Sequence, residues 1–228
     1  MWTYFVSVYY MSYRDEEGLL NDDDFYQFLN KITAFIWAYA ITNPGVNSLR
    51  TPIYSEMINV VNNQPVTFDE YLFNEDKVKN LFINYDFSNY RKITRSMLTW
   101  WVFQNPEQQL LDITTETDIE HIYARNRQKN ENSLSNPKNL ESLGNKSLLE
   151  KTINIRASDY RFEDKRKYYL GGYKNNRNQV KEGTNIKELV DLANTKNDFT
   201  ETDIEQRHKE IISKFIEFMD DNELLSKE

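Results

Sequence analysis

The stretch D-I-E-H-I-Y, residues 118–123, organises the rest of the chain. Ile119, His121 and Tyr123 would share one face of an extended segment and Glu120 the other, which indicates a short β-strand. A polar segment follows and leads to N-L-E-S-L-G-N-K-S-L-L-E-K-T-I-N-I-R, residues 139–156. There we expect a second short strand near 145–149 and a helix through Asn154. The predicted order is therefore strand, loop, strand and helix.

Four polar residues occur in a fixed order along these elements. Glu120 and His121 come first, Asn145 comes at the second strand, and Asn154 lies on the helix. A single histidine on a strand face is usually structural. Both asparagines, however, lie in short apolar stretches, where an amide side chain is tolerated only when it is hydrogen-bonded. Together the four residues are the candidates for a functional site.

This order resembles the HNH (ββα-metal) nuclease module at the C-terminal end of GmrSD-type modification-dependent restriction endonucleases. In that family E-H-I opens the motif, L-G-N and an apolar pair form the second strand, an asparagine lies on the helix, and Phe-x-x-Lys follows. The matching residues here are 120–122, 143–145, 148–149, 154 and 162–165, and I-E-Q-R-H at 204–208 resembles the C-terminal helix. Two departures stand out: Y-A-R follows E-H-I where a proline is usual, and G-N-K-S replaces the commoner G-N-L-T.

The resemblance implies a metal-dependent DNA endonuclease. A neutral imidazole can deprotonate water near pH 7, and a hard divalent cation can neutralise the scissile phosphate and assist the leaving oxygen. His121 is then the general base, and Glu120 and Asn154 are ligands of Mg²⁺ or Mn²⁺. Asn145 would hold the loop that carries His121. Strict alternation puts Glu120 and His121 on opposite faces. The strand must therefore end or bulge there, or else Asp118 becomes the rival ligand, provided that His121 is not the base.

The net charge of −8 is unevenly distributed. Residues 1–120 carry 8 basic and 17 acidic side chains, residues 121–181 carry 14 and 6, and residues 182–228 carry 6 and 13. A basic segment beside a nuclease motif predicts weak, sequence-independent and salt-sensitive DNA binding. The residues expected to contact nucleic acid are Arg125, Lys138, Arg161, Lys165, Arg166 and Lys167.

The expected fold class is α+β and mostly helical, with a helical domain followed by the ββα-metal (HNH-like) finger and a C-terminal helix. Apolar spacings of three and four predict helices near 24–42, 52–61, 78–85 and 90–103. Residues 1–13 form a helix or strand, and Thr202 with Glu205 predicts the start of the last helix. Polar loops are expected at 124–138 and after Gly171-Gly172, and Tyr168 and Tyr169 are expected in the core. We divide the chain into a helical connecting domain, 1–112, and an HNH-like nuclease domain with a C-terminal helical extension, 113–228.

The cellular setting follows from what the sequence lacks. Zero cysteines exclude disulfides and a cysteine nucleophile and fit a cytoplasmic protein, and no apolar run approaches the roughly 20 residues that cross a bilayer. The nucleotide-binding and target-recognising domain of the family carries a D-G-Q-Q-R-like motif, and none occurs here. We therefore expect a DNA-acting part of a restriction or phage-defence system whose recognition domain lies elsewhere in the protein or on a partner subunit.

Two alternatives stay open. The chain could be a helical interaction module whose finger is catalytically inactive, in which case divalent-metal binding would be absent. It could also be a nuclease that acts on RNA or as a toxin, which differs only in a substrate that the sequence does not encode.

Overall fold

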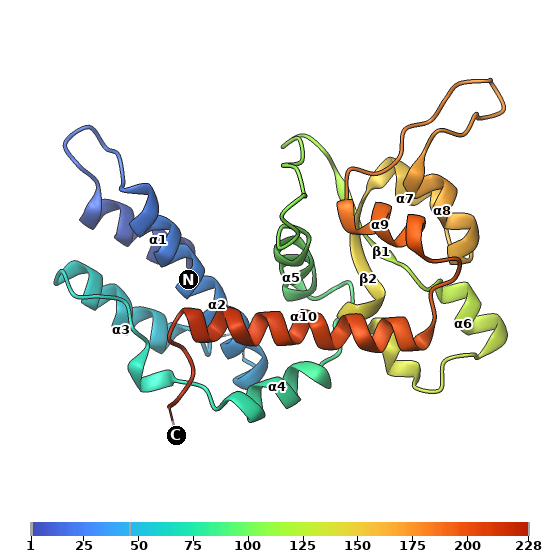
Figure 1. Cartoon of the computed structure of the whole chain (residues 1–228). Coiled ribbons are helices and arrows are strands. Elements are labelled where there is room, and N and C mark those ends of the chain that lie inside the picture. Colours follow the sequence, from blue (N-terminus) through green and yellow to red (C-terminus); the bar gives the residue numbers. More distant parts are fainter. Residues whose placement is uncertain (1, 46, 228) are drawn as a thin grey trace. The chain divides into compact units, whose positions relative to one another are not determined.

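The computed structural model describes residues 2–45 and 47–227, which form a mostly helical chain with a small antiparallel sheet (Figure 1). This confirms the predicted α+β class. The chain packs as two compact units, Met1–Tyr85 with Ile212–Glu228, and Asp86–Ile211. None of the described helices combines the length and apolarity needed to cross a membrane.

The first unit is helical around an aromatic core. Its elements are α1 (Trp2–Tyr13), α2 (Asp22–Thr42), α3 (Arg50–Val61), the 3₁₀ turn η1 (Asp69–Tyr71), α4 (Glu75–Ile83) and the end of the last helix. Phe35 and Phe68 are both fully buried, and their rings stack with centroids 3.7 Å apart. Phe5 packs edge-on against Phe28 at 5.0 Å. Phe28 and Phe35 belong to the apolar stripe that the helical spacing predicts, and Phe5 and Phe68 complete this core.

Helix α2 begins earlier than the sequence pattern indicated. The cap is Asn21, whose side-chain oxygen accepts a hydrogen bond from the Asp24 backbone at 3.0 Å, and not the expected pair of Asp24 and Gln27. An asparagine oxygen satisfies a free backbone N–H at a helix start, so the helix extends back to it. Its end at Asn43 agrees with the prediction.

The second unit contains the sheet. Its elements are α5 (Lys92–Val102), β1 (Thr117–His121), α6 (Arg125–Glu131), the 3₁₀ turns η2 (Pro137–Glu141) and η3 (Leu143–Asn145), β2 (Lys146–Glu150), α7 (Lys151–Ala157), α8 (Phe162–Leu170), α9 (Lys187–Thr195) and the first half of α10 (Glu201–Asp221). Strands β1 and β2 pair antiparallel, with Thr117 opposite Glu150 and His121 opposite Lys146. Helix α7 packs on both strands and α5 packs on β2. The two predicted strands and the helix after them are therefore present, whereas α6, η2 and η3 lie in the segment where only a loop was expected.

Two helices lie where polar loops or no element were expected. Helix α6 occupies part of 124–138 and buries none of its residues, and α9 follows the segment after Gly171-Gly172. A helix without a buried face has no apolar period for a sequence pattern to detect. Contacts from distant residues hold α6 instead, such as the ion pair of Arg127 with Asp198 at 2.8 Å.

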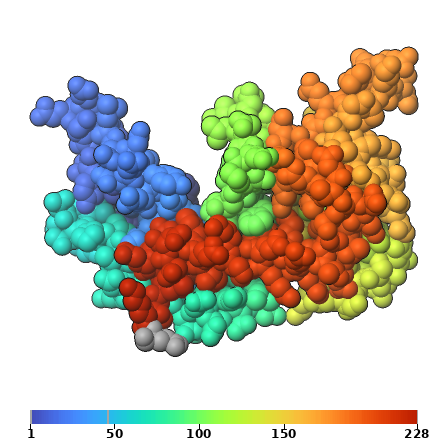
Figure 2. Space-filling view, in the orientation of Figure 1, coloured from blue at the N-terminus to red at the C-terminus, as the bar shows by residue number. Residues whose placement is uncertain are grey.

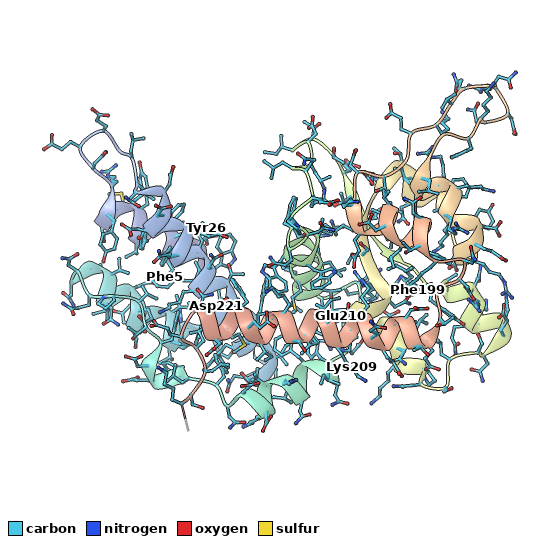
Figure 3. All side chains as sticks on the ribbon, viewed as in Figure 1. Phe5, Tyr26, Phe199, Lys209, Glu210 and Asp221 are labelled. Carbon is cyan, nitrogen blue, oxygen red and sulfur yellow. The ribbon has the colours of Figure 1, made fainter. Side chains whose placement is uncertain are left out.

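Helix α10 has the apolar stripe that was predicted, but it starts at a different cap. Thr200 donates from its backbone N–H and its hydroxyl to the Asp203 carboxylate, at 2.8 and 2.7 Å, so the cap lies two residues before the expected Thr202. Glu205 accepts instead from the Asn139 side chain at 3.0 Å. The stripe residues Ile204, Ile211, Ile212, Phe215 and Met219 are buried. Lys209, Glu210 and Asp221, on the remaining surface of the helix, are exposed (Figure 3).

Packing does not divide the chain at the predicted boundary of 112 and 113. Helix α5 belongs to the unit that holds the sheet, because it packs on β2. The chain from Ile212 onward belongs to the first unit, where Phe215 contacts Phe82 with ring centroids 4.7 Å apart. The division into a connecting and a nuclease region stays a prediction about function.

The L-G-N segment is fixed by its close approach to the first half of α10. A Cβ at Gly144 would lie 2.0 Å from the Ile204 carbonyl oxygen, so only glycine fits there. From the next turn of α10, the Arg207 guanidinium donates to the carbonyls of Leu143, Gly144 and Lys146 at 2.7, 3.0 and 2.7 Å. Buried Arg207 therefore holds the start of β2 in place.

Candidate active site

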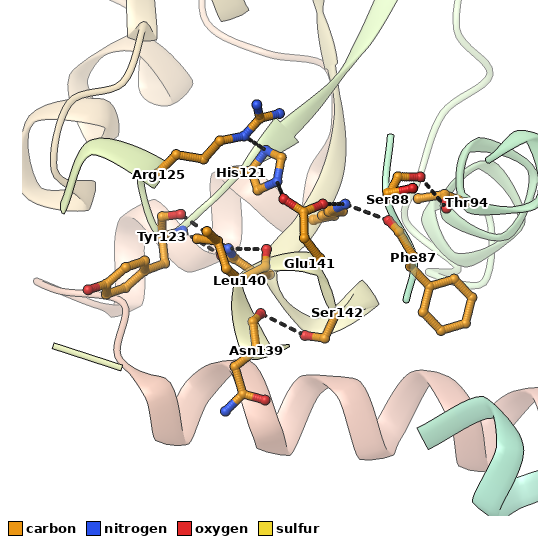
Figure 4. Close-up of polar contacts among 12 residues, drawn as sticks. Phe87, Ser88, Thr94, His121, Tyr123, Arg125, Asn139, Leu140, Glu141 and Ser142 are labelled. Atoms are coloured by element: carbon orange, nitrogen blue, oxygen red, sulfur yellow. Dashed lines mark hydrogen bonds and ion pairs between the residues drawn. The ribbon is translucent and has the colours of Figure 1, made fainter. Parts of the chain in front are cut away.

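His121 ends β1, and both of its ring nitrogens have partners (Figure 4). Nε2 lies 3.3 Å from Oε1 of Glu141, and Nδ1 accepts from Nε of Arg125 at 3.4 Å. An arginine can only donate, so Nδ1 is the unprotonated nitrogen. Nε2 then carries the proton and donates a hydrogen bond to the Glu141 carboxylate. The contacts define one tautomer of the imidazole.

Glu141 is itself held by a buried lysine. Lys146 lies opposite His121 across the sheet and is fully buried. Its Nζ donates to Oε2 of Glu141 and to the carbonyl oxygen of Phe87, each at 2.5 Å. Burial raises the pKa of the Glu141 carboxyl, but the hydrogen bonds from His121 and Lys146 outweigh that effect and lower the pKa to about 2. Glu141 is therefore a carboxylate throughout the neutral pH range.

The environment keeps His121 neutral at pH 7. Its side chain is buried, and burial lowers the pKa of the imidazole below 6.5. The hydrogen bond to Glu141 raises this pKa, whereas the positive charges of Lys146 and Arg125 lower it. The net shift is downward. A neutral imidazole, with one unprotonated ring nitrogen, is the form that can accept a proton.

Asn145 ties the residues after β1 to the residues before β2. It is fully buried, its Oδ1 accepts from the Tyr123 backbone at 2.7 Å, and its Nδ2 donates to the carbonyls of Tyr123 and Leu140 at 3.1 and 3.0 Å. Its own carbonyl accepts from Ile122 at 2.9 Å. These bonds fix the chain immediately after His121. They support the positioning role expected for Asn145.

Glu120 faces the opposite side of the sheet. The register is regular through His121, so β1 has no bulge that would bring the two side chains together. Oε1 of Glu120 accepts from Nζ of Lys165 at 2.7 Å and from the Tyr169 hydroxyl at 2.6 Å, and Lys165 also donates to the His121 carbonyl at 2.6 Å. Both charged side chains are buried. Glu120 is thus neutralised by an internal ammonium.

The ligand set implied for a divalent cation does not fit this arrangement. A cation at Glu120 would have to displace the Lys165 ammonium from the carboxylate. Asn154 is half-buried on α7, and within the described residues no hydrogen bond joins its side chain to Glu120 or His121. Asp118, the rival ligand, shares the strand face of Glu120. No group of three or more His, Asp or Glu residues that could hold a metal occurs in the described part of the chain.

The residues expected to contact DNA differ in solvent exposure and in whether they already pair within the protein. Arg125, Lys138 and Lys167 are exposed. Lys165 is only 1% exposed, so the expected phosphate contact is corrected to an internal ion pair. The other two also have internal partners: Arg161 pairs with Glu131, and Arg166 donates to the Ala193 carbonyl at 2.7 Å and to Asn197 at 2.9 Å.

Glu141 and Lys146 are the site residues that sequence reasoning missed. Glu141 lies in a 3₁₀ turn and contacts His121 across 20 positions of sequence, so no local spacing pairs the two. Lys146 did leave a signal, since it stands in G-N-K-S where G-N-L-T is commoner. A charged residue at an apolar strand position requires a buried partner. That partner is Glu141.

Two antiparallel strands and a helix, with a histidine ending the first strand and a clamping asparagine before the second, define a ββα unit. Comparison with known protein families matches residues 72–214 to the family described as GmrSD restriction endonucleases, C-terminal domain. Because this match spans more than half of the 228 residues, the chain belongs to that family. Comparison with curated proteins and with solved structures found no match.

Proposed function

We propose that the chain is an HNH-type DNA endonuclease region that hydrolyses phosphodiester bonds with His121 as the general base. The observation that carries this proposal is the oriented, neutral imidazole: Nε2 is directed to Glu141, and the Nδ1 lone pair faces Arg125. Nδ1 is the atom that takes the proton from the attacking water, once the Arg125 Nε–H has turned from Nδ1 to the scissile phosphate. Membership of a restriction endonuclease family supports DNA as the substrate.

Arg125 is proposed to hold the scissile phosphate. Its Nε lies 3.4 Å from Nδ1 of His121, and the residue is exposed. A guanidinium matches two phosphate oxygens at once and keeps its charge at every relevant pH. The phosphate would therefore be bound beside the nitrogen that deprotonates water, and charge developing on it would be stabilised.

Mg²⁺ or Mn²⁺ remains part of the proposal, with Asn154 as its proposed ligand. Glu120 is not offered as a ligand, because its carboxylate forms the buried ion pair with Lys165. Recognition of the target is proposed to lie in a separate domain or a partner subunit, and the setting is proposed to be cytoplasmic phage defence. This chain alone should then bind neither ATP nor GTP.

The test is cleavage of plasmid DNA and of a matched RNA with Mg²⁺ or Mn²⁺ present. Cleavage of DNA, lost on addition of EDTA, is the expected result. Cleavage of RNA alone would select an RNA-acting nuclease instead. A folded chain that binds no divalent cation and cleaves neither substrate would select the inactive interaction module.

Replacing Glu141 with glutamine should change the pH profile of cleavage. In the wild type, activity falls at low pH as His121 becomes protonated, and this limb lies below pH 6.5 because the pKa of His121 is lowered. Glu141→Gln removes the hydrogen bond that raises this pKa, so the limb should move to still lower pH. The rate at pH 7 should also fall, by less than the roughly 10²–10⁴-fold that a general base contributes.

The measurement is kcat/KM between pH 4.5 and 8, with unfolding followed in parallel. The amide oxygen of the introduced glutamine can still accept from Lys146, which preserves the buried contact. Glu163→Gln, at an exposed position of α8, is the matched control and should leave the profile unchanged. An unchanged pH profile in Glu141→Gln would show that Glu141 does not influence the pKa of His121 during cleavage.

A further inference from the structure

The outer surface of α7 and α8 contains a cleft that is lined on one side by the segment after α8. The cleft has a volume of about 640 Å³. Four cations line it, Arg156, Lys167, Lys174 and Arg177, together with the rings of Tyr168 and Tyr173. None of its described lining residues is acidic. A concave surface with charge of one sign concentrates ligands of the opposite charge.

The segment after α8 is a hairpin rather than the irregular polar loop expected from its composition. Lys174 and Val180 form an antiparallel bridge, and Lys181 donates to the Tyr173 carbonyl at 2.9 Å. The Asn175 side chain accepts from the backbone of Arg177 and Gln179, at 3.0 Å each, and closes the turn. The hairpin extends beyond α7 and α8 (Figure 1) and stands out in orange on the surface of its unit (Figure 2).

The cations of this cleft are not neutralised within the protein. In the described part of the chain, no carboxylate lies within ion-pair distance of Arg156, Lys167, Lys174 or Arg177. Elsewhere in the same unit, Lys165 pairs with Glu120 and Arg207 pairs with Glu188. The four cations of the cleft, in contrast, keep their positive charge uncompensated, which makes the cleft a site for an anion.

Two of these cations are held in position by aromatic rings. The Arg156 guanidinium donates to the Tyr173 hydroxyl at 3.0 Å and lies 5.9 Å from that ring's centroid. The Lys167 ammonium lies 5.0 Å from the centroid of Tyr168, and the two rings meet edge to face at 5.3 Å. Cation–π contacts of this kind orient a cation without cancelling its charge. Tyr168 was expected in the core, but here it is half-buried and lines the cleft.

We propose that this cleft binds the phosphate backbone of the DNA substrate, away from the bond that is cleaved. The inference rests on the proposed nuclease function, because α7 carries both Arg156 and Asn154. Arg156 and Lys167 contact one stretch of phosphates from the helices, and Lys174 and Arg177 contact the same strand from the hairpin. The cleft thus supplies sequence-independent affinity, and recognition of modified bases lies elsewhere.

The experiment measures binding of duplex DNA to the full chain in a His121→Ala background, so that no cleavage occurs. Lys174→Gln/Arg177→Gln removes two exposed cations of the hairpin. Each lost phosphate contact lowers the magnitude of the slope of log K against log salt by about 0.9. For the double variant, the magnitude of this slope should therefore fall by about 1.8. Its Kd should rise roughly tenfold or more at 0.1 M salt.

The matched control is Lys92→Gln/Lys209→Gln, which removes two exposed charges of the same unit outside the cleft. The control should keep the parental Kd and slope. A cleft variant that binds like the control would overturn the proposal. Tighter, cleft-dependent binding of a matched RNA duplex would overturn the assignment to DNA.

The proposed cleft and the proposed nuclease activity can be rejected independently of each other. Loss of DNA affinity in the cleft variant, combined with no cleavage by the chain that retains His121, would support the cleft and reject the nuclease. Cleavage that depends on His121, together with unchanged affinity in the cleft variant, would support the nuclease and reject the cleft.

Discussion

Replacing His121 with alanine should lower the rate of DNA cleavage by about 10²–10⁴-fold, the contribution of a positioned general base. The side chain lost is the neutral imidazole between Glu141 and Arg125, whose Nδ1 is the proposed acceptor of the proton of water. The measurement is nicking of supercoiled plasmid under single-turnover conditions. Divalent-cation binding should persist, because His121 is not a proposed ligand.

The control for this variant is the other histidine. His208 lies in α10 beneath Gly144 and takes no part in the proposed chemistry. His208→Gln should keep its activity per folded molecule, with the folded fraction measured by circular dichroism. Robust cleavage by folded His121→Ala would refute the assignment of the base.

Replacing Glu120 with alanine should lower the free energy of unfolding by about 3–5 kcal/mol, the usual effect of leaving a buried charge without its partner. Lys165 would remain buried with only the His121 carbonyl as an acceptor, and the Tyr169 hydroxyl would lose its acceptor as well. The measurement is urea denaturation. Glu120→Gln/Lys165→Met should recover most of the loss, because it removes both charges and keeps an amide oxygen for Tyr169.

The double variant also separates the two roles considered for Glu120. It should bind Mn²⁺ in calorimetry as the wild type does, because the carboxylate is engaged in the ion pair and is not a ligand. Normal stability combined with lost Mn²⁺ binding would make Glu120 a ligand and would reject the structural role.

The predictable part of the site is local in sequence. Strand β1, strand β2 and α7 follow from alternation, turn residues and the Glu-His, Asn, Asn order, because each depends on neighbours within a few residues. Asn145 could be singled out because a buried amide needs partners, which proved to be Tyr123 and Leu140. Strict alternation put Glu120 and His121 on opposite faces, and the regular register through both residues lacks the bulge that joint roles at one metal site would have required.

The remaining contacts depend on the tertiary fold. Glu120 meets Lys165 across 45 positions, and Glu141 meets His121 across 20. The excess of basic residues at 121–181 could be counted from the sequence, but which of them are neutralised could not. Arg161 is paired with Glu131, 30 positions away, whereas Lys174 and Arg177 face the cleft. The charge map therefore located the basic segment but not its binding surface.

The assignment of His121 as the general base depends on the protonation state of its ring, which can be measured. With only two histidines in the chain, ¹⁵N-labelled imidazole signals can be assigned with the His208→Gln variant and followed by NMR across pH. We expect a His121 ring that is neutral at pH 7, protonated at Nε2 and unprotonated at Nδ1, with a pKa below 6.5. A His121 ring that is charged at pH 7, or that carries its proton on Nδ1, would contradict the assignment.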